Sequence, residues 1–294
     1  MYIAHNLGAL PAAANAAKAN NKTFIFDAED FHRNEVSDDI KSLNYNISKY
    51  IEDKYLSKTT VVTAASPLIA LEYKKLYPAI IIKPILNVFE RVKTRQSIPN
   101  PGGLKLFWFS QFIGGQRGIE EVIEAIGLCD PSAGITLSLL GNYTSETYKY
   151  FTVLAKKHGL LQNQVIFYKP VPPVDILTFA MQFDIGLATE LATPYNRDIC
   201  LTNKIFTYIQ AGLAVIASDT KAQVQLLNEH QTIGMLYKKG NAEELANALK
   251  LYTKNPGALQ KAKQNAYVLG QTTLNWETES EKLLDIVSEV LKQR

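Results

Sequence analysis

The sequence contains only two cysteines, Cys129 and Cys200, among its 294 residues. Two cysteines cannot build a disulfide framework or a four-ligand zinc site, and their scarcity is typical of a reducing compartment. Long hydrophobic runs are also missing, because no apolar stretch reaches the ~20 residues that a transmembrane helix needs. The alanine-rich start, MYIAHNLGALPAAANAAKA, has no basic region, and His5 and Asn6 interrupt its apolar residues, which argues against a signal peptide. These absences indicate a cytoplasmic protein without a transmembrane segment.

Charge of one sign is not in excess either. The 31 Lys and Arg residues nearly balance the 28 Asp and Glu residues, giving a net charge of +3, and the basic residues are scattered along the chain. A nucleic-acid-binding surface needs concentrated positive charge, so the sequence indicates no nucleic-acid partner. The glycine-bearing stretch SQFIGGQRGIEEVIEAI (110–126) fits neither G-x-G-x-x-G nor a P-loop, which excludes a dinucleotide or Walker-type site there.

What the sequence does contain is a regular alternation of short apolar runs and helical patterns. Hydrophobic residues make up 47% of the chain, enough to bury a sizeable core. The apolar runs are continuous, as is typical of strands that are covered on both faces. Repeated strand–helix units predict parallel strands with right-handed crossovers. We therefore expect an α/β protein with two Rossmann-like, doubly wound parallel-sheet domains.

The expected elements fall into two sets on either side of a polar linker, RVKTRQSIPNPGG (91–103), which carries two prolines and a Gly-Gly pair. The first set has strands at 2–5, 23–28, 60–65 and 79–86 and helices at 9–19, 36–57 and 67–76. The second set has strands at 104–110, 135–141, 165–170, 184–189, 213–218 and 232–237 and helices at 119–128, 145–157, 174–182, 203–211, 220–228, 241–253, 256–269 and 276–293. This division predicts an N-terminal domain over 1–98, a C-terminal domain over 99–275, and a last helix, 276–294, that packs back on the N-terminal domain.

Four strands are few for a doubly wound domain, which usually has about six. Met1 also falls almost directly on a strand. We therefore expect the first domain to be N-terminally truncated. A parallel sheet that lacks strands exposes an edge and apolar surface, so self-association over that edge is one expected way to cover it.

Ligands of open parallel sheets bind at the carboxyl ends of the strands, where helix N-termini point. The loop of 110–126 carries Gly115 and Arg117 in front of an amphipathic helix, and backbone amides together with an arginine suit a phosphate. The alternative is a flexible loop with a solvated arginine. Gly141 ends another strand in LLGN. The proline-bounded FYKPVPP, with Lys169 and Val171, is either a surface for a flat ring or a plain turn.

The stretch LTNKIFTYIQAGLAVIASD (201–219) predicts a helix that begins at Thr202 or Asn203 and ends before Gly212, followed by a buried strand. Lys204 lies in the first turn of this helix. A cation is unfavourable near the positive end of a helix dipole unless an anion is present. The helix start is therefore predicted to face negative charge, the alternative being a lysine that extends to water.

These stretches together resemble the nucleotide-sugar glycosyltransferases with the GT-B fold, in particular the retaining family 4 group. NKIFTYIQAGLAVIASD resembles that group's N-K-L-F-E-Y helix and the strand after it, and QRGIEEVIEAI resembles its E-K-G loop and helix. LLGN, VIFYKPV and DIGLA match other strand ends in order and spacing, so the resemblance covers nearly all of 104–293. In the first domain it takes in YIAHNLGALPAA, FDAEDFH and VVTAAS.

The resemblance implies two domains that face one another across a cleft, with the donor on the C-terminal domain. Arg117 and Lys204 would neutralise the donor diphosphate, so no metal and no cofactor are expected. Lys169 and Val171 would contact the base. The implied donor-binding residues are Gly115, Gly141, Lys169, Val171, Thr202, Asn203 and Thr207, and the implied catalytic residues are Arg117, Lys204, Glu190 and Glu29.

The sequence departs from the family pattern at three places. The family's pair of glutamates eight residues apart falls on Ile199 and Thr207, although Glu190 lies upstream in the same loop and is available for the sugar. The arginine after the first strand of the second domain is Gln111. The histidine of the N-terminal cleft falls on Glu29, which with Asp27, Asp30 and His32 predicts a polar cluster where acceptor and donor sugar meet. The alternative reading of that cluster is an acidic turn that caps the next helix.

The sequence thus predicts a retaining, metal-independent glycosyltransferase that moves a sugar from a nucleotide-diphosphate donor to an unknown saccharide or lipid-linked saccharide acceptor, as in polysaccharide biosynthesis. Because both glutamates are replaced, a non-catalytic remnant that binds nucleotide or a partner chain is the main alternative. A nucleotide-sugar epimerase, which uses a similar two-domain fold, is a third. Product analysis without an acceptor separates an epimerase from a transferase.

Overall fold

The computed structural model describes residues 1–92 and 102–292 and divides into two compact units. Unit 1 comprises 1–87, 192–201 and 276–294, and unit 2 comprises 88–191 and 202–275. Within the described residues the strands form two parallel sheets, one of four strands in unit 1 and one of six strands in unit 2. The α/β class with two parallel sheets is therefore confirmed.

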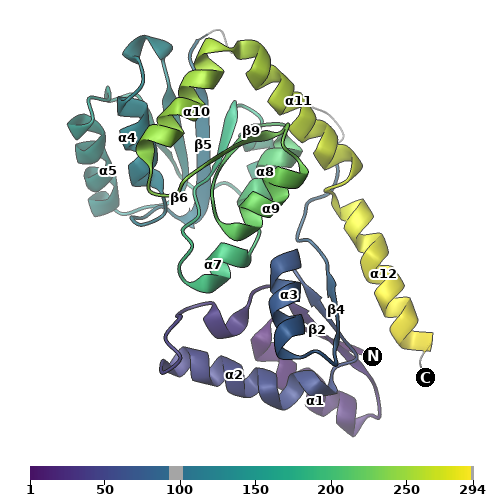
Figure 1. Cartoon of the computed structure of the whole chain (residues 1–294). Helices are drawn as coiled ribbons and strands as arrows, with labels where there is room; N and C mark the ends of the chain where they lie inside the picture. Colours follow the sequence, from purple (N-terminus) through teal and green to yellow (C-terminus); the bar gives the residue numbers. More distant parts are fainter. Residues whose placement is uncertain (93–101, 293–294) are drawn as a thin grey trace. The chain divides into compact units, whose positions relative to one another are not determined.

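Unit 1 carries its four strands in sequence order, β1-β2-β3-β4. Its strands and helices are β1 (Tyr2–His5), α1 (Leu10–Ala19), β2 (Phe24–Ala28), α2 (Leu43–Tyr55), β3 (Val61–Ala64), α3 (Pro67–Leu76), β4 (Ile81–Pro84), α7 (Tyr195–Ile199) and α12 (Trp276–Lys292). The sheet has two differently covered faces, because successive side chains of a strand point to opposite sides. Phe26, Val62 and Ala64 pack with α1 and α3 on one face. Ile25 and Val61 pack with α12, drawn in yellow in Figure 1, on the other.

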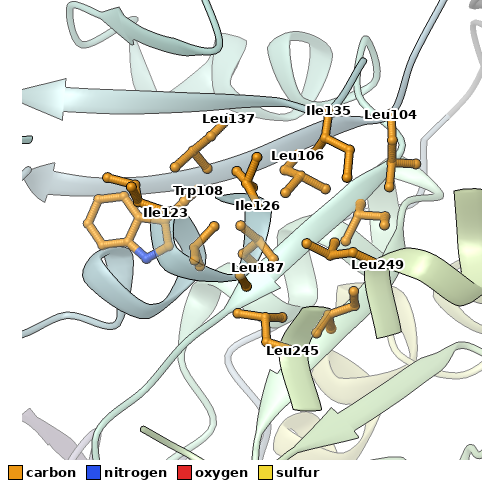
Figure 2. Packing of buried hydrophobic residues seen from close by; sticks show 14 of the residues in the cluster. Leu104, Leu106, Trp108, Ile123, Ile126, Ile135, Leu137, Leu187, Leu245 and Leu249 are labelled. Carbon is orange, nitrogen blue, oxygen red and sulfur yellow. The ribbon is translucent and has the colours of Figure 1, made fainter. Parts of the chain in front are cut away.

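Unit 2 has the strand order β10-β9-β8-β5-β6-β7. Its strands and helices are β5 (Lys105–Phe112), α4 (Ile119–Gly127), β6 (Thr136–Asn142), α5 (Ser145–Lys157), β7 (Val165–Tyr168), α6 (Ile176–Ala180), β8 (Ile185–Ala188), α8 (Asn203–Ala211), β9 (Ala214–Ser218), α9 (Lys221–Glu229), β10 (Gly234–Tyr237), α10 (Ala242–Lys254) and α11 (Pro256–Thr272). Figure 2 shows part of its core, where Leu106 and Leu137 from the sheet meet Ile126 of α4 and Leu249 of α10.

Most expected elements are confirmed, with two differences. The helix expected over 36–57 is wrong at its start, because α2 begins at Leu43, where the Ser42 side chain accepts a hydrogen bond from the Tyr45 amide. The short helix α7 was not predicted, since five residues carry too little periodicity to detect.

The expected domain layout differs from the two units at two places inside the chain. Residues 88–92 belong to unit 2, although the sequence placed them in the first domain. Residues 192–201 pack with unit 1, although the sequence placed them in the second domain. The expected boundary between residues 98 and 99 and most of the expected linker lie outside the described residues. Over 1–92 and 102–292, none of the helices combines the length and the apolar character needed to cross a bilayer.

Candidate functional site

The sheet of unit 2 has its topological switch point between β5 and β8. The chain runs from β5 outward through β6 and β7, then returns to the other side of β5 to form β8. Ligands of open parallel sheets bind at the carboxyl ends of the strands at such a point, because the two flanking loops diverge there. The loops after β5 and β8 are the ones that contain Arg117 and Glu190.

The two loops are tied together by a hydrogen bond. The Thr189 hydroxyl, just after β8, donates to the carbonyl oxygen of Arg117 at 2.8 Å. Gly118 holds the N-cap position of α4 with a φ of +79°, and a Cβ atom there would lie 2.5 Å from the Thr189 Cβ. Only glycine suits both the positive φ and the close approach. The structure therefore places the Arg117 loop beside the end of β8, with the Arg117 guanidinium donating to the Ser110 hydroxyl at 2.8 Å.

Lys204 and Glu190 form an ion pair at the same end of the sheet. The Lys204 Nζ atom lies 2.5 Å from the Glu190 Oε1 atom, and the two side chains are 15% and 11% exposed. The Thr202 hydroxyl donates to the same Oε1 atom at 3.2 Å. The negative charge that the position of Lys204 required is thus supplied within the chain by Glu190.

The N-terminus of α8 is not capped by a side chain. Thr202 holds the N-cap position, but its side chain accepts no hydrogen bond from the helix amides. This corrects one reading of the sequence, in which Thr202 or the exposed Asn203 caps the helix. Unused amides at a helix N-terminus attract anions, because they point along the positive end of the helix dipole.

Trp108 of β5 lies against this ion pair. The Lys204 Nζ atom is 5.9 Å from the centroid of the Trp108 ring, within the range of a cation–π contact. The ring is buried in the core of unit 2 (Figure 2), and its Nε1 atom has no hydrogen-bond partner among the described residues. Sequence reasoning missed this residue, because an apolar strand gives no sign of what its aromatic ring touches.

Burial also shifts the pKa values of two groups of unit 2, Tyr208 in α8 and Glu121 in α4. The pKa of the Tyr208 hydroxyl is raised well above its usual value by burial and by the nearby Glu190 carboxylate. Burial raises the pKa of Glu121, in the first turn of α4, and hydrogen bonds from the Tyr237 hydroxyl and the Gly240 amide offset part of that rise. Both groups are hydrogen-bonded within unit 2. The Tyr208 hydroxyl donates to the Leu187 carbonyl, and the Glu121 carboxylate accepts the two hydrogen bonds just named.

The other expected donor contacts are not all at the switch point. Gly141 lies one residue before the end of β6, next to β5, where a Cβ atom would lie 2.3 Å from the Ser110 carbonyl oxygen. Gly115 is exposed in the Arg117 loop. Lys169 and Val171 follow β7, the edge strand two places from β5. The Lys169 Nζ atom lies 4.1 Å from the centroid of the Tyr143 ring, so this lysine covers an aromatic ring after β6.

The two positions where the family has glutamates are both buried. Thr207 is 2% exposed, and its hydroxyl donates to the Asn203 carbonyl within α8 at 2.9 Å. Ile199 is 1% exposed in the core of unit 1, and its carbonyl accepts a hydrogen bond from the Ser66 hydroxyl. The Gln111 carbonyl accepts from the Asn142 side chain. Glu190, which follows β8, is the carboxylate that contacts Lys204 at this end of the sheet.

The polar cluster expected in unit 1 is divided in two. Glu29 and Asp27 both contact His5, at 3.1 Å from the Nε2 atom and 2.7 Å from the Nδ1 atom respectively. His5 was not predicted as part of the cluster. It meets Asp27 because β1 and β2 pair with His5 opposite Asp27, a register that sequence spacing does not reveal.

Asp30 and His32 make their hydrogen bonds with other residues than His5, although Asp30 still interacts electrostatically with Glu29 and His32. His32 is buried, and its Nδ1 atom contacts the Glu35 carboxylate at 2.8 Å. This hydrogen bond lowers the pKa of Glu35. Asp30 accepts a hydrogen bond from the Asn196 side chain of α7 at 2.7 Å, and burial raises the pKa of Asp30.

Metal ligands are not grouped in the described residues. Over 1–92 and 102–292, no three His, Cys, Asp or Glu side chains come together in a way that could hold a metal ion. The cationic groups at the switch point are side chains, Arg117 and Lys204.

Comparisons with known proteins agree with this architecture. Residues 103–255, more than half of the chain, match the family described as glycosyl transferases group 1. No curated protein matches the chain. The matched region begins just before β5 and contains the whole switch point, from the Arg117 loop to α8 and β9.

Solved structures show the same fold at low sequence identity. HepE from Anabaena in complex with UDP has a TM-score of 0.78 and 17% identity, covering 98% of this chain and 78% of that one. Sucrose-phosphate synthase from Thermosynechococcus elongatus has a TM-score of 0.77 and 14% identity, covering 99% and 74%. WaaG, a glycosyltransferase involved in lipopolysaccharide biosynthesis, has a TM-score of 0.66 and 16% identity, covering 95% and 82%. The chain therefore belongs to the glycosyl transferases group 1 family and has the GT-B fold of these glycosyltransferases.

Proposed function

We propose that this chain transfers a sugar, with retention of configuration and without a metal ion, from a nucleoside diphosphate donor to a saccharide acceptor. The observation that carries the proposal is the meeting of Arg117, the Lys204–Glu190 pair and the start of α8 at the β5–β8 switch point. HepE, whose fold this chain shares, binds UDP and UDP-glucose, which supports a nucleotide sugar as donor.

The proposed chemistry is mainly electrostatic. When the bond between the sugar and the diphosphate breaks, negative charge develops on the leaving phosphate oxygen. Arg117, Lys204 and the amides at the start of α8 stabilise that charge from fixed positions, which lowers the barrier more than the same groups would in water. The acceptor hydroxyl then bonds to the sugar carbon on the face that the diphosphate leaves, and its proton passes to the departing phosphate oxygen. Binding groups with fixed positions also hold the donor sugar and the acceptor hydroxyl in the orientation that the reaction needs.

The proposed donor site draws on residues of both adjoining loops. Lys204 exchanges its contact with Glu190 for the diphosphate, and Glu190 then accepts hydrogen bonds from sugar hydroxyls. Gly115, Gly141, Thr202 and Asn203 offer backbone groups to the donor. The loop with Lys169 and Val171 contacts the base. Thr207 acts indirectly, because its hydroxyl already bonds within α8.

The remaining parts of the proposal concern acceptor, assembly and location. Glu29 contacts the acceptor in unit 1. The low cysteine content supports a cytoplasmic location, and self-association over the β1 edge of the four-stranded sheet stays a prediction that sedimentation tests.

Binding of the donor is the first experiment. The purified chain is heated with a panel of nucleoside diphosphates and their sugars, uridine nucleotides first. A ligand at ~100 times its Kd stabilises the chain by about 2.7 kcal/mol, which gives a clear rise in Tm. Arg117→Ala and Lys204→Ala should each raise the Kd about tenfold or more, because each removes a charged hydrogen-bond donor.

The control is Lys254→Ala, which removes an exposed lysine from the last turn of α10. Each variant is compared with its own unliganded Tm, because Lys204→Ala removes the cation that faces the Glu190 carboxylate and lowers stability by itself. A rise in Tm that survives both Arg117→Ala and Lys204→Ala would place the nucleotide elsewhere. No rise with any nucleotide would favour the non-catalytic remnant, whose supporting observation is the loss of both family glutamates to Ile199 and Thr207.

A further inference from the structure

Residues 192–201 form a segment, which we call the strap, that belongs to unit 1 although the chain on either side of it belongs to unit 2. The strap contains the short helix α7. Glu190 lies just before the strap and Thr202 directly after it, and the Thr202 hydroxyl donates to the Glu190 carboxylate at 3.2 Å. Both ends of the strap therefore meet at the end of the unit 2 sheet where Lys204 pairs with Glu190.

The strap is held in unit 1 by the side chain of Asn196, which is 4% exposed. Its amide nitrogen donates to the Asp30 carboxylate at 2.7 Å, and its amide oxygen accepts a hydrogen bond from the Phe31 backbone amide at 2.8 Å. Asparagine is the side chain of this length that offers an N–H donor and a carbonyl acceptor together. The buried amide of Asn196 therefore sets the position of α7 in unit 1.

The end of the strap nearest Thr202 is anchored as well. Ile199 is 1% exposed, and its carbonyl oxygen accepts a hydrogen bond at 2.6 Å from the hydroxyl of Ser66, which is 0% exposed. Thr202 follows Ile199 closely in the chain, and three steps of fully extended backbone span at most ~11 Å. A displacement of Ile199 is therefore passed on to Thr202, and so to the hydroxyl group that contacts Glu190.

The strap has little conformational stability of its own. α7 has only five residues, and an isolated helix of that length is unstable in water. Its shape therefore comes from its contacts with unit 1, to which Tyr195 adds hydrogen bonds from its amide to Asp38 and from its hydroxyl to Glu72. Loss of the anchors would leave Thr202 joined to unit 1 by a flexible segment.

The backbone and the side chain of Glu190 are held by different groups. The Ser218 hydroxyl donates to the Glu190 backbone carbonyl at 2.7 Å, which fixes the main chain within unit 2. The carboxylate is contacted by Thr202 and Lys204. When a diphosphate takes Lys204 from this pair, the hydrogen bond from Thr202 still orients the carboxylate. The orientation of Glu190 in the donor complex therefore depends on where the strap holds Thr202.

We propose that Asn196 is a positioning residue for the donor sugar. By docking the strap in unit 1 it fixes Thr202, and through Thr202 it fixes the carboxylate of Glu190. The contact of Glu190 with sugar hydroxyls rests on the proposed function, whereas the docking of the strap does not. Such a coupling is reciprocal, so a change at Thr202 also alters the contact between Asn196 and the Phe31 amide.

Amide hydrogen exchange, followed residue by residue by NMR, tests this coupling in the full chain without nucleotide. The Phe31 amide donates to Asn196, so its exchange rate reports whether the strap is docked. Thr202→Val removes the hydroxyl group at nearly constant size and should speed exchange of the Phe31 amide about threefold or more. The matched control is Thr152→Val, which removes a hydroxyl that bonds to the Tyr148 carbonyl within α5. It should leave the Phe31 amide unchanged.

Equilibrium binding of UDP and UDP-glucose, the ligands found with HepE, tests the consequence for the donor. Asn196→Ala should raise the ratio of the Kd of UDP-glucose to the Kd of UDP about threefold to tenfold, because UDP has no sugar for Glu190 to contact. A loss of folded chain would weaken both ligands alike and leave the ratio unchanged. The control, Asn44→Ala, alters an exposed asparagine of α2. Asn196→Ala combined with Thr202→Val should raise the ratio no more than the larger single effect.

The inference is overturned if Thr202→Val leaves exchange of the Phe31 amide unchanged, or if Asn196→Ala leaves the Kd ratio unchanged. Effects that add in the combined variant would also overturn it, because Asn196 would then not act through Thr202. If Asn196→Ala does not fold, Ser66→Ala replaces it, since that change removes the other anchor of the strap. If neither nucleotide binds, the proposed function fails, and the exchange measurement still decides whether the strap is coupled to Thr202.

Discussion

Burial decides what an ion pair contributes in this protein. Arg33 and Glu52 approach within 2.6 Å with side chains 7% and 0% exposed, and Lys49 and Asp53 approach within the same distance with side chains 48% and 43% exposed. Water screens the second pair and leaves it little net energy. The first pair is desolvated, and the Tyr73 hydroxyl donates to the same Glu52 carboxylate at 2.8 Å. Burial raises the pKa of Glu52, and the Arg33 charge opposes that rise.

Replacing Arg33 should therefore destabilise unit 1 far more than replacing Lys49. We expect Arg33→Ala to cost about 3–5 kcal/mol, because Glu52 is left buried and charged or must take up a proton. Lys49→Ala should cost less than about 1 kcal/mol. Urea denaturation of the two purified variants measures the difference. Equal losses would show that the buried pair is no more important than the exposed one.

The Lys204–Glu190 pair is also largely buried, but its position suits ligand binding rather than stability alone. Both side chains retain some exposure at the end of the sheet, 15% and 11%, so an entering anion can reach the lysine. A charge that is partly desolvated interacts more strongly with a new partner than one in water. The same pair that stabilises α8 in the free chain is therefore suited to exchange partners with a diphosphate.

At the scale of elements, the loop between β5 and α4 shows how backbone conformation fixes a site. Gly118 and Gly240 share a φ of +79°, but they differ in surroundings. A Cβ atom on Gly118 would lie 2.5 Å from the Thr189 Cβ, whereas a Cβ atom on Gly240 would meet nothing within 4 Å. The first glycine is needed for conformation and space, and the second for conformation alone.

Gly118→Ala should thus be more harmful than Gly240→Ala. The left-handed conformation costs about 1–2 kcal/mol for a non-glycine residue, and this is the whole cost expected at Gly240. At Gly118 the new methyl group also displaces Thr189 from the Arg117 carbonyl, so nucleotide binding should weaken together with stability. Thermal melts of both variants with and without nucleotide measure the two effects. Identical behaviour would mean that the contact with Thr189 is unimportant.

At the scale of the whole molecule, the chain returns twice to unit 1, once between the two stretches of unit 2 and once after the second. Residues 192–201 place α7 in unit 1, where the Asn196 side chain accepts from the Phe31 amide at 2.8 Å. Trp276 then begins α12, whose Val290 is 1% exposed against the sheet. Unit 1 is therefore built from three separate stretches of sequence, and its stability depends on segments encoded far from its strands.

Shortening one side chain of α12 should consequently affect unit 1 alone. We expect Val290→Ala to reduce the amide hydrogen-exchange protection of β2 and β3, because a buried side chain is cut back at the face of that sheet. Leu291→Ala is the control, since Leu291 is 44% exposed on the next position of the helix. Exchange in β5, β8 and β9 should not change. Loss of protection in unit 2 would indicate that the two units unfold together.

Much of the architecture could be predicted because local patterns determine it. Continuous apolar runs separated by helical patterns predict parallel strands joined by helical crossovers. Both sheets of the described residues are parallel. The bounds of α3, α5 and α8 agree with those predicted, because prolines, capping residues and Gly212 mark helix ends in the sequence itself. Arg117 and Lys204 were singled out from local patterns too, Arg117 in the turn between a strand and a helix and Lys204 in the first turn of a helix, and their role in donor binding stays a prediction.

The contacts of the candidate sites were decided only by the tertiary structure. Glu190 contacts Lys204 because the loop after β8 and the start of α8 meet at the end of the sheet. His5 joins Asp27 and Glu29 because β1 pairs with β2 in one register, and a shift of one residue would turn the imidazole to the other face. The sequence determines most strands and helices through short-range periodicity, whereas pairs of residues from separate strands meet only when the sheets have formed.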